Sequence, residues 1–146
     1  MNDIPASRSI VIERMMPHPP AKVWRALTQA SLVGEWLMKN DLQPVVGHRF
    51  NFRAEPQGGW NGVTDCEVLE VEPLSRLVYS WRSSGEQAAT GINSVVTWTL
   101  TPAEGGTQVR MEHSGFRPQD EQFYRGANYG WQQMVAGLER VAGGLD

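Results

Sequence analysis

The chain has 146 residues, a length that predicts one domain, 1–146. Its core is expected to be large enough to fold without disulfides or bound metals. Its composition, 40% hydrophobic and 20% charged, is ordinary for a globular protein, and its net charge of −3 argues against a general binder of nucleic acids or anionic membranes. The single cysteine, Cys66, excludes an intrachain disulfide.

The N-terminal part of the chain predicts a cytoplasmic protein that starts with a strand. Residues 1–16 lack a basic stretch followed by a long apolar one, so no secretory signal is predicted. No apolar run approaches the ~18 residues that a transmembrane helix needs, so no membrane span is predicted. Residues 7–16, SRSIVIERMM, alternate apolar and polar side chains, and this pattern predicts the first strand.

Two short helices are predicted next. The prolines of PHPP, residues 17–20, break the strand and suit a helix start, because proline at the first helical position loses no needed hydrogen-bond donor. Apolar residues at helical spacing follow. Ser31 is in position to cap a second helix that ends near Leu37, and the chain is expected to bend between the two helices at 29–31.

Five strand-like segments separated by turn signals occupy the middle of the chain. Apolar and polar residues alternate in each of them, and a bulge is expected in the second, before Val71. The EGG sequence between the last two segments predicts a tight hairpin turn, and residues 83–91 predict a longer polar loop. The five segments are 47–55, 58–73, 76–82, 92–102 and 106–116.

The last segment predicts one long amphipathic helix. Apolar or small residues recur at spacings of three and four from Phe123 to Leu145, which is the pattern of a helix with one continuous apolar stripe. Leu138 is expected to seal the core. Trp131 and Met134 are instead expected to face a chamber between this helix and the strands.

The element order, one strand, two helices, five strands and a helix, predicts an α+β fold. Hairpin-length connections make the middle strands antiparallel neighbours, and one curved sheet of about six strands cannot bury its inner face alone. The C-terminal helix is long enough to cover that face, and the small residues Ala127, Gly130 and Gly137 are expected to leave room for a cavity. Its predicted walls are Phe50, Phe52, Tyr79, Trp81, Trp98, Met111, Phe116, Trp131 and Met134.

Several stretches of the chain together carry a family resemblance. They are PAKVWRALT, GHRFNF, CEVLEVEPLSRLVYSW, VVTWTLTPAEGGTQVRMEHSGF and YGWQQMVAGLERV, with Trp36 between the first two, and they span roughly Ile10 to Val141. With them the chain resembles the SRPBCC/START-like helix-grip superfamily, and within it the family named for the activator of heat shock protein 90 ATPase. The resemblance implies a curved antiparallel sheet wrapped around a long C-terminal helix, with a cavity between them.

The same resemblance implies ligands and partners. Members of the superfamily bind lipids, sterols, polyketides and other hydrophobic molecules, and some are cyclases or hydrolases. The family has no shared catalytic motif to carry over, so no catalytic residue is assigned. The family name also implies a chaperone as a partner, although the chain is too short to contain the additional N-terminal domain of the eukaryotic co-chaperone.

His113 is the chief candidate for chemistry, and two interpretations of it stay open. One is a polar group in the cavity that orients a ligand or moves a proton. The other is a hydrogen-bonded core histidine. Cys66 is expected to be an apolar packing residue on the inner face. His18 and His48 add two conceivable metal ligands, but no spacing typical of zinc sites occurs, so no metal and no cofactor is predicted.

Other candidates lie near the predicted rims of the sheet. Trp36, Trp60 and Tyr124 either rim the cavity mouth or fill a core edge. Asp65 and Arg53 fall in neighbouring strands, and an inward orientation near the rim stays open for both. The charged strand residues are otherwise expected on a solvated outer face: Arg49, Arg53, Arg82, Arg110, Glu67, Glu70 and Glu72.

The sequence therefore predicts a protein that binds a small hydrophobic or amphipathic ligand, lipid-like or polyketide-like, between sheet and C-terminal helix. Trp98 and Trp131 are expected to line the chamber from opposite sides, and His113, Tyr79 and Tyr124 to give specificity. The alternatives are a co-chaperone-like interaction module and a cavity-based cyclase or hydrolase that uses His113. The residues favour a binding protein over an enzyme, and they do not distinguish a monomer from a homodimer. The predicted binding residues are Trp36, Phe50, Phe52, Cys66, Tyr79, Trp81, Trp98, Met111, His113, Phe116, Tyr124, Trp131 and Met134.

Overall fold

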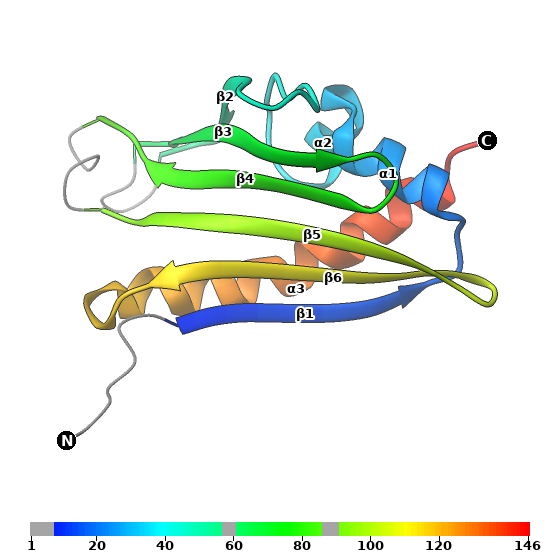
Figure 1. Ribbon diagram of the computed structural model, residues 1–146. Coiled ribbons are helices and arrows are strands. Elements are labelled where there is room, and N and C mark those ends of the chain that lie inside the picture. The colour runs from blue at the N-terminus through cyan, green and yellow to red at the C-terminus, as the bar shows by residue number, and fades with distance from the viewer. Residues whose placement is uncertain (1–7, 57–60, 86–90) are drawn as a thin grey trace.

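The computed structural model describes residues 8–56, 61–85 and 91–146, and it contains a six-stranded antiparallel sheet with helices against one face (Figure 1). The strand order across the sheet is β1-β6-β5-β4-β3-β2. The strands are β1 (Arg8–Met16), β2 (Arg49–Arg53), β3 (Val63–Glu72), β4 (Arg76–Ser83), β5 (Asn93–Ala103) and β6 (Gly106–Phe116). The helices are α1 (Pro20–Thr28), α2 (Ala30–Trp36), the short 3-10 helix η2 (Pro118–Asp120) and α3 (Glu121–Gly143).

This arrangement confirms the predicted α+β helix-grip architecture and its element order. In Figure 1, α3 runs behind the sheet, from the end where β6 stops toward α1 and α2. The first strand joins the sheet beside the last one, because β1 pairs with β6 and places Ile12 opposite Met111.

Among the helices in the described parts of the chain, none is long and apolar enough to cross a membrane.

The two N-terminal helices meet at Gln29, within the predicted bend. Gln29 has an extended backbone (φ −85°, ψ 120°), its N–H donates to the carbonyl of Arg25, and its own carbonyl accepts the first hydrogen bonds of α2. The predicted cap at Ser31 is therefore wrong. Ser31 lies inside α2, and no side chain caps this helix, because the same peptide that closes α1 opens α2.

The middle strands follow the predicted segments, with shorter bounds at several ends. The expected bulge is confirmed, and it lies at Leu69, where the β3–β4 register shifts between Val68 and Glu70. Residues 57–60 and 86–90 lie outside the described residues. The start of the predicted strand 58–73, and most of the predicted loop 83–91, are therefore outside the described structure.

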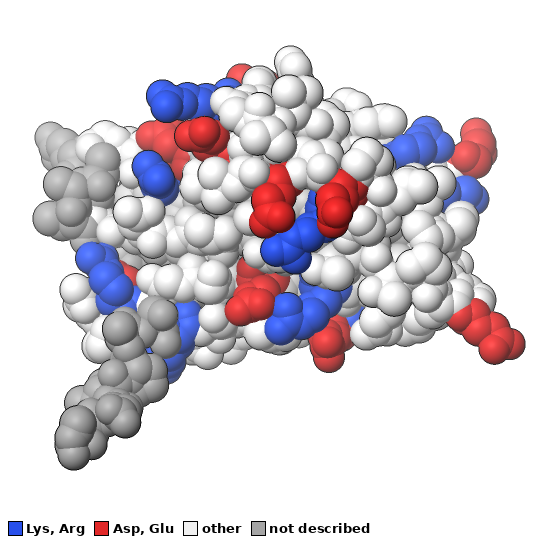
Figure 2. Space-filling view, viewed as in Figure 1, with Lys and Arg blue, Asp and Glu red and all other residues white. Residues whose placement is uncertain are grey.

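The two faces of the sheet differ as the alternating patterns predict. On β6, Val109, Met111 and His113 are buried against the helices, whereas Arg110 and Glu112 lie on the outer face and form an ion pair at 2.9 Å. Figure 2 shows acidic and basic side chains interspersed on this outer face. The core therefore lies on one side of the sheet, between the strands and the helices.

Candidate functional site

Two tryptophan rings meet where α3 crosses the sheet. Trp98 comes from β5 and Trp131 from α3, and their ring centroids lie 5.8 Å apart in an edge-to-face arrangement. Trp36 contacts Trp98 in the same way at 5.6 Å. Trp98 and Trp131 were expected to line a chamber from opposite sides, and this expectation is wrong. The two rings are in direct contact, so no space for a ligand separates them.

Further aromatic side chains extend this cluster toward β2 and β4. The ring of Phe52 lies 5.3 Å from Phe50, 5.9 Å from Tyr79 and 5.3 Å from Trp81, all on the inner face of the sheet. Phe50, Phe52 and Tyr79 are buried, but Trp81 is only half-buried. Met111 is fully buried, directly across the β5–β6 ladder from a cluster tryptophan. The cluster is thus closed at its centre and partly open at Trp81.

The polar atom of Tyr79 is already engaged within the core. The indole N–H of Trp98 donates to the Tyr79 hydroxyl oxygen, with an N···O distance of 3.1 Å. Burial raises the pKa of Tyr79 far above its ordinary value, so its hydroxyl keeps its proton. Tyr79 therefore satisfies a buried indole N–H that would otherwise lack an acceptor.

His113 is held by hydrogen bonds from both of its ring nitrogens. The indole N–H of Trp131 donates to Nδ1 at 2.9 Å, and Nε2 lies 2.7 Å from the hydroxyl oxygen of Ser94. Because an indole nitrogen only donates, Nδ1 must be the unprotonated nitrogen, and the neutral ring carries its hydrogen on Nε2. Nε2–H then donates to Ser94, whose hydroxyl donates to the carbonyl of Trp81 at 2.9 Å.

This tautomer decides what the histidine is able to do. A serine nucleophile needs an unprotonated histidine nitrogen to take its proton, but the nitrogen next to Ser94 carries a hydrogen of its own. Burial lowers the pKa of His113 to about 3, so the ring stays neutral near neutral pH. In this arrangement His113 and Ser94 form a structural hydrogen-bond chain rather than a nucleophile with its base. Of the two interpretations of His113, the geometry matches the hydrogen-bonded core histidine.

Cys66 lies in an environment that suppresses its reactivity. The residue is buried, and its thiol donates to the carbonyl of Thr64 with an S···O distance of 3.8 Å. Burial, with a smaller effect of the nearby Asp65 charge, raises the pKa of the Cys66 thiol far above its ordinary value. Within residues 8–56, 61–85 and 91–146, no three His, Cys, Asp or Glu side chains gather closely enough to hold a metal ion.

Two of the aromatic residues predicted near the cavity rim, Trp36 and Tyr124, differ in burial. Trp36 fills a core edge: it is 6% exposed, and its indole N–H donates to the carbonyl of Ala26 at 2.8 Å. Tyr124 is half-buried, contacts Phe116 edge-to-face at 5.4 Å, and has the guanidinium of Arg8 3.9 Å above its ring. Trp60 lies outside the described residues.

The small residues of α3 do not all leave room. A Cβ added at Gly137 would lie 3.0 Å from the Cβ of Trp36, so this glycine permits close contact between α2 and α3. The expectation of space at Gly137 is therefore wrong, because Trp36 occupies it. At Gly130, an added Cβ would meet only the end of the Met134 side chain, at 3.4 Å. Ala127 and Met134 are half-buried against the core.

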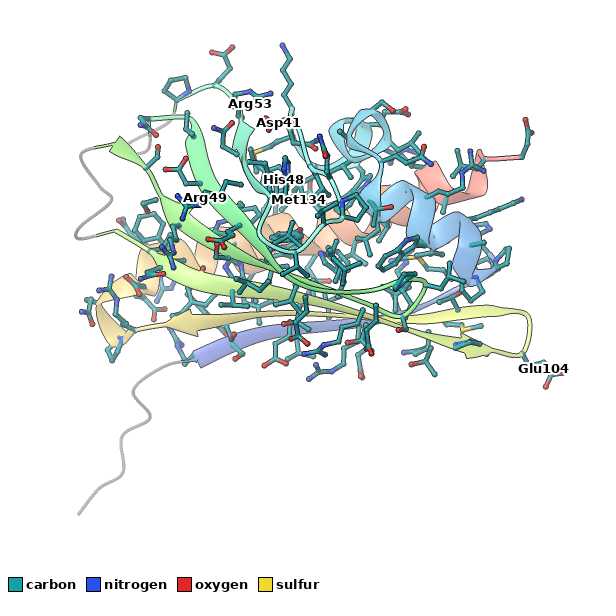
Figure 3. The ribbon with its side chains drawn as sticks, turned by 45° about the horizontal axis from the view of Figure 1, so that its top comes forward. Asp41, His48, Arg49, Arg53, Glu104 and Met134 are labelled. Carbon is teal, nitrogen blue, oxygen red and sulfur yellow. The ribbon has the colours of Figure 1, made fainter. Side chains whose placement is uncertain are left out.

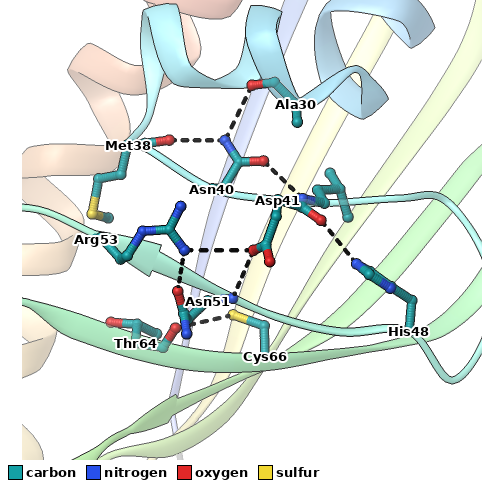
Figure 4. A network of polar contacts seen from close by, with 10 residues as sticks. Ala30, Met38, Asn40, Asp41, His48, Asn51, Arg53, Thr64 and Cys66 are labelled. Carbon is teal, nitrogen blue, oxygen red and sulfur yellow. Dashed lines mark hydrogen bonds and ion pairs between the residues drawn. The ribbon is translucent and has the colours of Figure 1, made fainter.

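The outer face of the sheet carries a second site, a polar pocket at the β2 edge that the sequence patterns did not predict. The segment before β2 folds over this edge and contributes Asp41, whose carboxylate lies 3.6 Å from the Arg53 guanidinium (Figures 3 and 4). The same carboxylate accepts the backbone N–H of Asn51 at 3.5 Å, and the Asp41 carbonyl lies 2.8 Å from His48 Nε2. Asp41 comes from a loop, where no periodic pattern indicates which strand it will reach.

Comparisons with other proteins agree with this fold. Residues 17–143 match the family described as Activator of Hsp90 ATPase homolog 1-like protein. Protein MLL2253 from Mesorhizobium loti is 52% identical over 95% of this chain and 99% of its own, with a TM-score of 0.86. CalU16 from Micromonospora echinospora is 26% identical over 95% of this chain and 80% of its own, with a TM-score of 0.73. DynU16, described as a protein in the dynemicin biosynthetic locus, is 26% identical over 90% of this chain and 46% of its own, with a TM-score of 0.73. The comparison with curated proteins gives no match.

Proposed function

Because the chain belongs to the family of Activator of Hsp90 ATPase homolog 1-like proteins, whose fold is one that binds ligands, we propose that it binds a small hydrophobic or amphipathic molecule. The site lies between the sheet and the first half of α3. The molecule enters beside Trp81 and Tyr124, and the aromatic cluster forms the floor of the site.

The incomplete burial of the first half of α3 supports this proposal. None of the residues from Glu121 to Gly130 is buried, although the second half of the same helix buries Trp131 and five further residues. The half-buried Tyr124 and Ala127 nevertheless pack against the core cluster. An apolar helix face that is only partly covered, next to a half-buried tryptophan, is a surface from which a ligand can displace water.

The polar atoms of the interior indicate the chemistry of the ligand. Among the described residues, no buried side-chain nitrogen or oxygen lacks a hydrogen-bond partner. The two central indole N–H groups are already accepted by Tyr79 and His113. A charged group buried here would find no free partner, so the inserted part of the ligand is apolar and any polar part stays at the mouth. The binding free energy then grows with the apolar area that the ligand buries, by about 25 cal/mol per Å² before the costs of binding are subtracted.

The comparisons support a small organic ligand. DynU16 is described as a protein in a biosynthetic locus, and it shares this fold at 26% identity. For this chain we propose only a class of ligand: a lipid-like or polyketide-like molecule with an apolar ring or chain.

A substitution in the first half of α3 tests the proposal. We expect a fatty acid, a sterol or a polycyclic phenol to quench tryptophan fluorescence in a saturable way and to raise the thermal midpoint. Ala127→Leu fills the proposed space and should weaken binding at least about tenfold, or 1.4 kcal/mol. Gln133→Leu introduces the same leucine side chain at an exposed position of the helix and should leave binding unchanged. Equal effects of the two substitutions, or no saturable binding by any probe, would contradict the proposal.

An exposed apolar loop favours a second candidate function, interaction with a chaperone. Val45 and Val46 are 58% and 62% exposed, and Leu69 on β3 is 41% exposed. The N–H of Gly47 donates to the carbonyl of Val68 at 2.8 Å, so this loop lies beside β3. If this surface binds purified Hsp90, the chain should change the ATPase rate of Hsp90, and replacing both valines with serine should abolish the effect. An unchanged rate would remove this candidate.

A further inference from the structure

The polar pocket lies on the face of the sheet opposite the aromatic cluster. It has a volume of about 420 Å³ and is formed mainly by β2, β3 and β4, with Asp41 above them. The strand register places the polar residues of its lining on one face, because Asn51 pairs with Asp65, and Asp65 pairs with Arg82. Side chains at such paired positions point to the same side of a sheet. The lining also includes Phe50 and Cys66, which alternate with them along β2 and β3. The polar side chains of the pocket therefore point away from the interior site proposed above.

Three acidic side chains and two basic ones, Arg49 and Arg82, line the pocket. With Arg53, which lies outside the lining, four of the charged side chains form two ion pairs. Arg49 lies 3.7 Å from Glu67, and Arg53 lies 3.6 Å from Asp41. Figure 3 shows Asp41, Arg49 and Arg53 gathered around β2. These ion pairs neutralise the charges on the β2 side of the pocket. Two charged side chains remain on the β3–β4 side.

The remaining two charges, Asp65 and Arg82, are opposite in sign but do not pair with each other. They face one another across the β3–β4 ladder, and both are exposed. Neither side chain forms a hydrogen bond or an ion pair with another residue in the described parts of the chain. The pocket thus presents one carboxylate and one guanidinium side by side, each with its hydrogen-bonding groups directed to solvent.

The floor of the pocket adds a hydrogen-bond donor. Ser80 is 5% exposed, and its hydroxyl oxygen accepts the backbone N–H of Glu67 at 2.9 Å. That bond uses the oxygen as an acceptor, so the hydroxyl hydrogen stays available to donate. Ser80 lies next but one to Arg82 on β4, on the same face, so a group bound by Arg82 is within reach of this hydroxyl.

We propose that this pocket binds a small zwitterion that carries an ammonium and a carboxylate, as an amino acid does. The ammonium pairs with Asp65, and the carboxylate pairs with Arg82 and accepts the Ser80 hydroxyl hydrogen. The charge balance favours this class, because Arg49 neutralises Glu67 and Arg53, outside the lining, neutralises Asp41. A neutral zwitterion then pairs with the two remaining charges, Asp65 and Arg82. A simple anion would meet the unpaired carboxylate of Asp65, and a simple cation would meet the unpaired guanidinium of Arg82.

Amide chemical shifts in a two-dimensional NMR titration test this site. The probes are β-alanine and 4-aminobutyrate, compared with butyrate and butylammonium, which each carry one of the two charges. We expect one or both zwitterions to shift the amides of β3 and β4 around Asp65 and Arg82 in a saturable way that weakens with salt. Asp65→Asn and Arg82→Gln should each weaken binding about fivefold, the range of an exposed ion pair.

Matched substitutions outside the pocket are the controls. Glu70→Gln and Arg76→Gln remove an ion pair of 3.3 Å on the same face of the sheet and should leave the titration unchanged. Exchanging the two charges, Asp65→Arg with Arg82→Asp, should restore part of the affinity lost by either single variant, because a zwitterion then binds in the reversed orientation, without the Ser80 hydrogen bond. Equal shifts from the singly charged probes, or equal losses in the Glu70 and Arg76 variants, would overturn the proposal. A titration without saturation would overturn it too.

Discussion

The two halves of α3 share one apolar periodicity but differ in burial. In the second half, Trp131, Val135, Gly137, Leu138, Val141 and Ala142 are buried. In the first half, from Glu121 to Gly130, none is. The periodicity determines which side of the helix faces the sheet, but it does not determine how deeply that side is covered.

The difference follows from what packs beside each half. α2 reaches the second half, since Trp36 contacts Gly137, and the ring of His18, just before α1, lies against Gly143. The first half contacts the sheet mainly near its start, by the ion pair between Arg8 and Glu121, the stacking of Arg8 over Tyr124, and the edge-to-face contact of Tyr124 with Phe116. The N-terminal helices therefore complete the core at one end of α3 and leave the other end less covered.

The largest expected effect is the loss of stability from truncation in the second half. Leu138→Ala removes a fully buried side chain and should lower the free energy of unfolding by about 2–5 kcal/mol. Phe123→Ala in the first half removes a side chain that is 36% exposed and should cost at most about 1 kcal/mol. Urea unfolding measures both values. Similar losses of stability would contradict the difference in burial between the two halves of α3.

The next effect is the pH dependence of stability that His113 produces. Its pKa is about 3 in the folded protein, well below the ordinary ~6.5 of an unfolded chain. Below pH ~6.5 the unfolded chain therefore binds a proton that the folded chain does not, and stability falls as the pH falls toward 3. The slope should reach about 1.4 kcal/mol per pH unit.

A histidine substitution isolates this slope. Urea unfolding of His113→Gln, measured between pH ~6.5 and ~4.5, should show a weaker pH dependence than the parent protein. His48→Gln changes a histidine whose ring lies near the outer pocket, and it should keep the slope. An unchanged slope in His113→Gln would contradict the buried neutral ring, and with it the account of the Trp131 hydrogen bond.

The smallest expected effect compares glycine replacements in the two halves. Gly126→Ala adds a methyl group with no atom within 4 Å, so it should stabilise the protein by about 0.5–1 kcal/mol through helix propensity. Gly137→Ala places its Cβ 3.0 Å from Trp36 and should destabilise by about 1 kcal/mol, because α2 must shift. Thermal unfolding distinguishes the two signs. Stabilisation by both would show that α2 adapts freely and that the second half is not tightly packed.

The sequence was sufficient for the fold because alternation and helical spacing are local signals. The inward positions of Trp98, Met111 and His113 follow from period two along β5 and β6. The organisation over 1–146 as one domain, the cytoplasmic location and the oligomeric state stay predictions.

The site depended on contacts between distant segments, which periodicity does not encode. The tautomer of His113 is determined by Trp131 and Ser94, which are 18 and 19 residues away. The space expected at Gly137 is occupied by Trp36 from another helix. The direction of a side chain was predictable in these cases, but the atom that it meets was not.

Mapping a bound apolar ligand by NMR tests the central claim most directly. A saturating polycyclic phenol should shift the indole N–H signal of Trp81 and the amides of residues 121–130. The amides of residues 135–143 should shift little, since that half of α3 is already packed. Shifts confined to Val45, Val46 and Leu69, or spread equally along α3, would contradict a ligand site under the first half of the helix.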